Sequence, residues 1–264
     1  MLYPPATMQP APAALSLTWL DAAAVIGTGI VAGFFNVTAG GGSLLTLPLL
    51  ILYGLPAPVA NGTNRLALVA QNLVAVPTFR RGGVRGLRST WPLIAVALPG
   101  AILGAVAGAT VSDALFKKVL GVLILALAAV VVSRPPEHEP DDAPPPARYR
   151  PATFGAFVLL GLYAGFVQAG IGFLIVFALA GLERFPLLRA HAFKVTIVLA
   201  LQTVALVVFA ALGKVMWGVG LLLAVGLATG GYIGARIALR SGERALRVLL
   251  VVASAALALK LLFG

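Results

Sequence analysis

A group of polar residues interrupts an apolar segment between residues 61 and 72. Counting from the first of them, the others follow after 3, 4 and 11 positions, which keeps all four near one helix face: Asn61, Asn64, Arg65 and Asn72. Thr63 adds a hydroxyl group in the same turn. A guanidinium flanked by amides can form a forked pair with two oxygens of a small oxyanion, such as sulfite or a sulfonate. The segment therefore predicts an anion site with Arg65 as its charged group.

A second polar group lies in the other half of the chain, where His191, Lys194 and Gln202 stand in a similar order. We expect Lys194 to add a second positive charge to the anion site and Gln168 to add hydrogen bonds. A cation at membrane depth costs at least about 2.5 kcal/mol on insertion scales, and it usually faces a protein interior or a water-filled path. In the alternative interpretation, Arg65 and Lys194 only extend to the membrane interface near their helix ends.

Glycines break the apolar sequence before each polar group. Gly40, Gly41 and Gly42 form a run longer than helix packing requires, and glycine disfavours an uninterrupted helix. A weaker break follows at Gly170 and Gly172. Broken helices expose N–H groups at their new N-termini, which bind anions, so we expect residues 40–42 to contact the substrate. Six further glycines are expected to serve close helix packing instead: Gly33, Gly104, Gly108, Gly226, Gly230 and Gly234.

Composition places these residues in a membrane protein. The chain has 264 residues, of which 60% are hydrophobic and 10% charged, and its mean hydropathy is +1.03. Soluble domains carry about 25% charged residues. Apolar segments long enough to cross a bilayer recur, and they lack the alternation of a transmembrane β-barrel. The net charge of +11 comes from short loops between these segments, so it indicates topology, and we expect no nucleic-acid partner.

The titratable residues argue against catalysis. The chain has no cysteine and two histidines far apart in sequence, so we predict no metal site and no cofactor. The apolar segments contain one aspartate, Asp21, and no pair of residues typical of intramembrane catalysis, so we predict that the protein is not an enzyme. Asp21 and His191 are the candidates for proton coupling, since histidine titrates near neutrality. Asp21 also lies near a helix start, where an aspartate at the interface costs little.

The chain divides into two halves of about five apolar segments each. We predict an N-terminal transmembrane repeat over residues 1–133, a proline-rich charged linker over 134–150, and a C-terminal repeat over 151–264. The second segment of each half is too short to cross the membrane alone. The expected segments are Trp19–Thr38, Ser43–Tyr53, Asn61–Phe79, Trp91–Val111, Leu115–Val132, Phe154–Gln168, Phe173–Leu182, His191–Leu212, Val215–Ala235 and Ala245–Leu262.

Short motifs recur in the same order in both halves. Residues 29–36 match residues 161–168, the two glycine breaks match with a gap, and a Pro-x3-Ala motif recurs. An odd number of crossings per half would make the halves an inverted pair, as in many secondary transporters. The positive-inside rule favours five crossings per half, because that count puts the arginines of residues 80–88, 184–189 and 236–247 on one side. Four crossings with re-entrant short segments remain the alternative. The fold class is therefore an all-α polytopic membrane protein of 8–10 transmembrane helices.

The motifs GxxxGFFNVTAGGGSLLTLPLL and GLPAPVANGTNR resemble those of the sulfite and organosulfonate exporter family, TauE/SafE, also called the toluene sulfonate uptake permease family. Weaker matches follow at GFVQAGIGF and AHAFK. The resemblance implies a carrier in the bacterial inner membrane that moves small sulfur oxyanions or sulfonates outward, driven by the proton gradient. It also implies site positions at residues 40–42, 61–65 and Lys194. The second half departs from the pattern at Phe173 and at Ala192-Phe193, which suggests that the first half contributes more ligands.

The sequence thus predicts a multi-pass transporter for small anions that works by alternating access in a lipid bilayer. A passive anion channel is the nearer alternative, and an accessory factor of sulfur metabolism is the more distant one. The sequence leaves open whether the protein forms a homodimer, and it does not identify the substrate.

Overall fold

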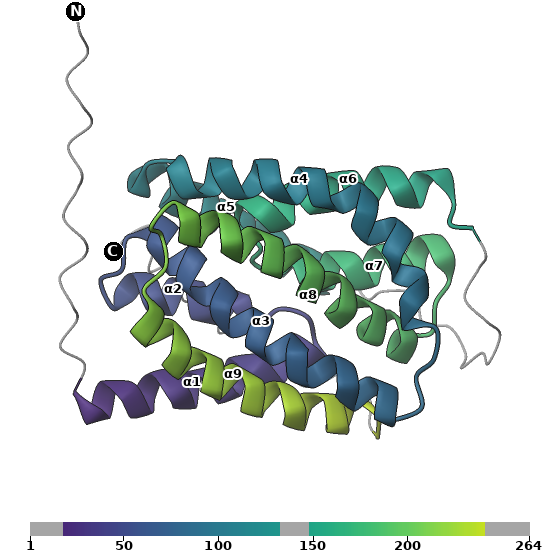
Figure 1. Cartoon of the computed structure of the whole chain (residues 1–264), viewed down its shortest axis with the longest axis horizontal. Coiled ribbons are helices and arrows are strands. Elements are labelled where there is room, and N and C mark those ends of the chain that lie inside the picture. The colour runs from purple at the N-terminus through teal and green to yellow at the C-terminus, as the bar shows by residue number, and fades with distance from the viewer. Residues whose placement is uncertain (1–17, 133–147, 241–264) are drawn as a thin grey trace, which may run out of the picture.

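In a computed structural model, the chain forms a bundle of α-helices, described for residues 18–132 and 148–240 (Figure 1). Within these ranges there is no strand, and a single 3-10 turn, η1 (Leu87–Thr90), precedes α4. The helices are α1 (Trp19–Thr38), α2 (Ser43–Leu52), α3 (Ala57–Arg81), α4 (Trp91–Thr110), α5 (Asp113–Val132), α6 (Pro151–Phe166), α7 (Ile171–Glu183), α8 (Leu187–Ala211) and α9 (Trp217–Ala238).

Four stretches of the described chain are long and apolar enough to cross a membrane, namely α1, η1 with α4, α8 and α9. The helices α2, α6 and α7 are apolar but shorter, with 10, 16 and 13 residues. The all-α polytopic fold is confirmed. The predicted segment Ala245–Leu262 and residues 134–147 of the predicted linker lie outside the described residues, and the division into two repeats stays a prediction.

Helices α3 and α8 begin earlier than the sequence indicated. We expected α3 to start at Asn61 after a turn at residues 55–58, but it starts at Ala57. Pro56 is the N-cap residue and Pro58 lies in the first turn, where proline costs little because its missing N–H has no intrahelical partner. Helix α8 starts in the same way, with Pro186 as its N-cap.

Glycines bring two helix pairs into close contact, α1 with α9 and α4 with α6, which lie along each other in Figure 1. A Cβ added to Gly29 of α1 would lie 2.9 Å from Gly226 Cα of α9. A Cβ added to Gly104 of α4 would lie 2.8 Å from the backbone nitrogen of Phe166 in α6. Alanine at either position would push the helices apart. The prediction that glycines 33, 104, 108, 226, 230 and 234 serve packing is confirmed, since an added Cβ would crowd backbone or side-chain atoms at each.

The connections between helices gather at two opposite ends of the bundle. At one end, the Tyr149 hydroxyl donates to the carbonyl oxygen of Ser89 at 3.0 Å, and the Arg150 N–H donates to Glu183 Oε1 at 3.0 Å. At the other end, the Ala57 N–H donates to the Asp113 carboxylate. The arginines of the described connections lie mainly at the first end: Arg80, Arg81, Arg85, Arg88, Arg148, Arg150 and Arg184. The bundle therefore has one strongly basic end.

Candidate functional site

The two helix breaks touch each other in the interior. Gly40 adopts a φ of +88°, and a Cβ there would lie 2.7 Å from the carbonyl carbon of Gly172. A Cβ on Gly42 would lie 2.6 Å from Cβ of Asn36, and the carbonyl of Gly41 accepts the N–H of Leu44 at 2.9 Å. Close approach of neighbouring atoms therefore requires glycine at positions 40 and 42, and the N-terminus of α2 lies beside that of α7.

Arg65 is fully buried, and its guanidinium group caps the C-terminal end of α6. Nη1 donates to the carbonyl oxygen of Ala164 at 3.0 Å and to Gln202 Oε1 at 2.7 Å, while Nη2 donates to the carbonyl of Gly165. The guanidinium carbon also lies 4.5 Å from the ring centroid of Phe209. The last carbonyls of a helix have no intrahelical partner and carry partial negative charge, so a cation there is stabilising.

Lys194 caps the C-terminal end of α1 in the same way. Its Nζ donates to the carbonyl oxygens of Asn36 at 2.9 Å and Val37 at 2.8 Å, and it lies 3.2 Å from Nδ1 of His191. The side chain of Lys194 is 2% exposed. The interpretation in which Arg65 and Lys194 extend to the membrane interface is therefore wrong for both residues, because other helices enclose them.

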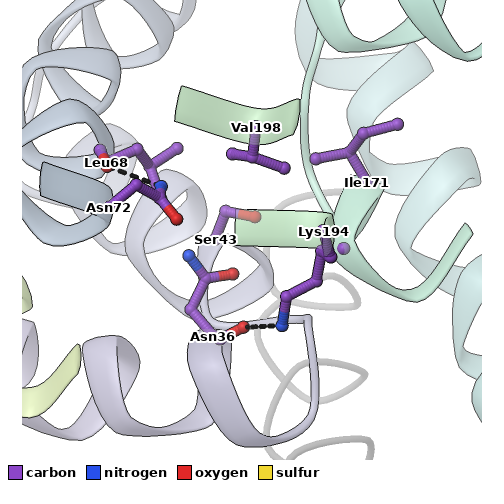
Figure 2. Close-up of a pocket in the computed structure, with 8 residues that line it drawn as sticks. Asn36, Ser43, Leu68, Asn72, Ile171, Lys194 and Val198 are labelled. Atoms are coloured by element: carbon purple, nitrogen blue, oxygen red, sulfur yellow. Dashed lines mark hydrogen bonds between the residues drawn. The ribbon is translucent and has the colours of Figure 1, made fainter. Parts of the chain in front are cut away.

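A small cavity with both polar and apolar lining lies where α1, α2, α3, α7 and α8 meet (Figure 2). In Figure 2, Asn36, Ser43 and Lys194 approach one another from three different helices. The volume that the centre of a water molecule can occupy in the cavity is about 10 Å³, so the cavity has room for about one water. It is lined by Asn36, Ser43, Leu68, Asn72, Ile171, Gly172, Lys194 and Val198. A sulfite ion or sulfonate group is larger than one water, so its entry requires these helices to separate.

The other predicted substrate residues occupy three different surroundings. Asn61 Nδ2 donates to the carbonyl oxygen of Phe166 at 2.7 Å, so Asn61 lies beside Arg65 at the end of α6. Thr63 Oγ1 accepts the N–H of Met216 at 2.9 Å, at the start of α9. Asn64 and Gln168 are fully buried, and none of their side-chain nitrogen and oxygen atoms has a partner in the described part of the chain.

The two proton-coupling candidates lie in different environments. Asp21 forms a capping box with Thr18 at the start of α1, where Asp21 Oδ2 accepts the Thr18 N–H at 3.0 Å. His191 lies in the interior beside Lys194. Among the described residues there is no group of three or more His, Cys, Asp or Glu side chains that could hold a metal ion.

Four residues that contact these groups were absent from our predicted site: Asn36, Ser43, Asn72 and Gln202. The sequence did carry a signal for three of them. Asn72 and Gln202 share a helix face with the cations, and Asn36 corresponds to Gln168 in the repeat. Ser43 carried no such signal, because its role depends on where the break in α1 directs the chain.

Helix breaks that converge around buried cations, in an apolar helical bundle, define a polytopic membrane protein of the transporter class. The chain belongs to the TauE/SafE sulfite exporter family, whose model matches residues 25–261. It is 31% identical over 234 residues to a "Probable membrane transporter protein ORF9" of Sinorhizobium sp., covering 88% of each chain. It is 30% identical over 237 residues to a "Probable membrane transporter protein" of Haemophilus influenzae, covering 89% of this chain and 92% of the relative.

A third relative, the "Probable membrane transporter protein YfcA" of Escherichia coli K12, is 29% identical over 239 residues, which is 89% of this chain and 87% of the relative. No solved structure matches the chain significantly. The protein is therefore a multi-pass membrane protein of a bacterial transporter family, and the names of its relatives indicate transport rather than catalysis.

Proposed function

We propose that this protein is a secondary transporter for small sulfur-containing anions, such as sulfite or an organosulfonate, across the bacterial inner membrane. The family description names sulfite export, and the relatives are named as membrane transporters. The proposed substrate residues are those predicted from the sequence: Gly40, Gly41, Gly42, Asn61, Thr63, Asn64, Arg65, Gln168 and Lys194.

The burial of Arg65 carries the proposal. Its side chain is 0% exposed, and its hydrogen-bond acceptors in the described residues are carbonyl and amide oxygens rather than carboxylates. An uncompensated buried charge is strongly unfavourable, typically by about 3–5 kcal/mol where a partner has been removed. A bound oxyanion would supply the missing negative charge. It would have to compete with the carbonyls of α6 for the guanidinium group.

We further propose that the two halves form an inverted repeat and that transport proceeds by alternating access. In Figure 1, α1 and α3 run toward the basic end, whereas α6 and α8 run away from it. Each half also packs its first helix on the fourth helix of the other half, α1 on α9 and α6 on α4. Rocking of such halves around a central site is how inverted-repeat carriers expose that site to each side in turn.

Proton coupling is proposed through His191, because it lies 3.2 Å from the Lys194 ammonium group in the interior. Protonation of this imidazole would add positive charge next to Lys194 and so favour anion binding. Asp21 is the less favoured candidate because it caps the start of α1, far along that helix from the break. By the positive-inside rule, the end that carries Arg80 to Arg88 faces the cytoplasm.

The test is flux of radiolabelled sulfite, sulfate and ethanesulfonate through proteoliposomes, with and without an imposed pH gradient. Arg65→Lys keeps the positive charge but loses the planar guanidinium group, which can donate two parallel hydrogen bonds to an oxyanion. We expect flux to fall about tenfold, which corresponds to the loss of one charged hydrogen bond. The matched control is Arg81→Lys in the exposed basic end, which should leave flux unchanged. Flux that ignores the pH gradient would instead favour a passive channel. Absence of flux for all three anions would withdraw the proposed substrate class.

A further inference from the structure

Helices α3 and α8 correspond residue by residue. Each has 25 residues and follows an N-cap proline, Pro56 or Pro186, so a shift of 130 positions aligns them. Lys194 then corresponds to Asn64 rather than to Arg65. The shared glycines of α1 and α6 align those helices by a shift of 132. The resulting pairs are Asn64 with Lys194, Leu68 with Val198, Asn72 with Gln202, and Asn36 with Gln168.

This correspondence maps the polar lining of the cavity onto a second set of residues. The cavity is lined by Asn36, Asn72 and Lys194, together with both Leu68 and Val198 of one corresponding pair. The equivalents of three of its four polar residues are Gln168, Gln202 and Asn64, whereas the fourth, Ser43, corresponds to Phe173. The two halves together form the cavity around Lys194. Because the halves are related by the repeat, we expect a second site in which each half contributes the residues that the other half contributes to the first.

The same three residues carry buried polar atoms that lack hydrogen bonds. The atoms are both side-chain atoms of Asn64, both of Gln168 and Nε2 of Gln202, and Nε of the neighbouring Arg65 joins them. All four side chains are 0% exposed. Buried amides are nearly always hydrogen-bonded in native proteins, so these unbonded atoms indicate groups that a ligand, a water molecule or a conformational change will satisfy. This observation is independent of the alignment of the repeats.

The polar residues around Lys194 and those around Arg65 lie at different positions along the long axis of the bundle. Arg65 contacts Gln202 at one level, whereas Asn72 and Lys194 line the cavity at another. Arg65 and Asn72 are seven residues apart on α3, which at 1.5 Å per residue is about 10 Å along the helix. Arg65 lies nearer the end where α3 begins, and Lys194 nearer the basic end where α8 begins.

We propose that Asn64, Gln168 and Gln202 form, with Arg65, a second oxyanion station, equivalent by the repeat to the cavity around Lys194. The first station consists of Asn36, Ser43, Asn72 and Lys194. The ligand of both is a small tetrahedral or pyramidal oxyanion, for which Arg65 or Lys194 supplies charge and the amide and hydroxyl groups supply donors. The anion passes from one station to the other as the halves move. This inference rests on the proposed function.

The absence of cysteine from the chain allows a direct test with single-cysteine variants in the full-length protein. Asn64→Cys and Gln202→Cys probe the Arg65 station, and Ser43→Cys probes the Lys194 station. Thr203→Cys is the matched control, because Thr203 is adjacent to Gln202 but exposed on the outer surface of α8. Intact cells and inside-out vesicles are treated with methanethiosulfonates that carry either an ethylsulfonate or an ethyltrimethylammonium group. Sulfate and ethanesulfonate serve as protecting ligands, since sulfite cleaves the mixed disulfides.

We expect Asn64→Cys and Gln202→Cys to react from the outer side, about tenfold faster with the sulfonate reagent than with the cationic one, as a positive site concentrates anions. Both anions should slow the reaction. Ser43→Cys should show the same preference from the cytoplasmic side, and Thr203→Cys should show neither preference nor protection.

Labelling of both Arg65-station variants without protection, or with a preference for the cationic reagent, overturns the second station. So does a failure of both variants to react from either side, provided that their melting temperatures in detergent match the wild type. This labelling experiment tests the second station separately from the proposed transport function. Anion protection without flux in proteoliposomes would support the second station and contradict the proposed transport function. Flux without protection would support the transport function and contradict the second station.

Discussion

The two halves of the chain satisfy the carbonyl groups at the ends of their broken helices with different residues. Each half has a broken helix whose C-terminal carbonyls need donors in the interior, and each receives a cation from the third helix of the other half. In one case the donor is the guanidinium of Arg65, which also contacts Gln202 and Phe209. In the other it is the ammonium of Lys194. The comparison indicates that these cations hold the halves together, because each donates to carbonyls of the other half.

The breaks themselves also differ. The first uses Gly40 at a φ of +88°, where the chain touches Gly172. The second also has a left-handed glycine, Gly170 at a φ of +69°, but it adds Gln168, a residue with a side chain, at a φ of +60°. A left-handed conformation is unfavourable for residues other than glycine, asparagine and aspartate. The second break therefore keeps a buried amide at the cost of backbone strain, which is a pattern typical of functional sites.

The largest expected effect comes from removing a cap. Arg65→Met would leave the carbonyls of Ala164 and Gly165 and the side chain of Gln202 without their donor, and we expect a loss of stability of about 1–3 kcal/mol for each buried acceptor that stays unsatisfied. Lys194→Met should cost less, because the ammonium group caps two carbonyls without a fork. Thermal unfolding of both variants in detergent measures the difference. Equal losses would contradict the view that the guanidinium is the stronger cap.

The next effect concerns the contact between the breaks. Gly40→Ala combines a left-handed residue, at about 1–2 kcal/mol, with a Cβ that would approach Gly172 to 2.7 Å. We expect it to melt well below the wild type. Gly54→Ala is the matched control, because Gly54 has a similar φ of +92° and open space around its Cβ position. If the two variants melt alike, the contact between the breaks contributes nothing.

Substitutions in the helix pairs test whether the halves are equivalent. Gly104→Ala in α4 and Gly230→Ala in α9 occupy corresponding positions, and each would force two helices apart at about 1–3 kcal/mol. We expect similar decreases in melting temperature. Gly218→Ala, with no atom within 4 Å of the added carbon, serves as the control and should be neutral or slightly stabilising. A large difference between Gly104→Ala and Gly230→Ala would show that the two interfaces are not energetically equivalent.

The smallest effect is expected for Gln168→Gly. Glycine relieves the left-handed strain, so stability should change by about 1 kcal/mol or less, in the favourable direction. Anion flux should nevertheless fall, since the amide is lost. Stability and proteoliposome flux measured on the same preparation separate the two roles. Unchanged flux with increased stability would show that Gln168 has no part in transport.

The sequence by itself determined the fold class, most helix bounds to within two residues, and the identity of the buried cations. These follow from local information: apolar segments of membrane length, glycine runs that disfavour helix, and charged residues within hydrocarbon-like sequence. Helix α1 was predicted with both ends correct, and α2 with an error of one residue. The early start of α3 was missed because a proline suits the first turn of a helix as well as a turn between helices.

Only the tertiary structure decided what the cations contact. Arg65 meets residues about 100 positions away in α6, and Lys194 meets residues about 157 positions away in α1, and no local pattern encodes such pairs. The distances between helices depend on glycine contacts between α1 and α9 and between α4 and α6, where backbone shape and not hydropathy sets the fit. Packing also places Ser43 and Asn36 beside Lys194 around one cavity. Sequence thus identified the charged groups, and packing determined their partners.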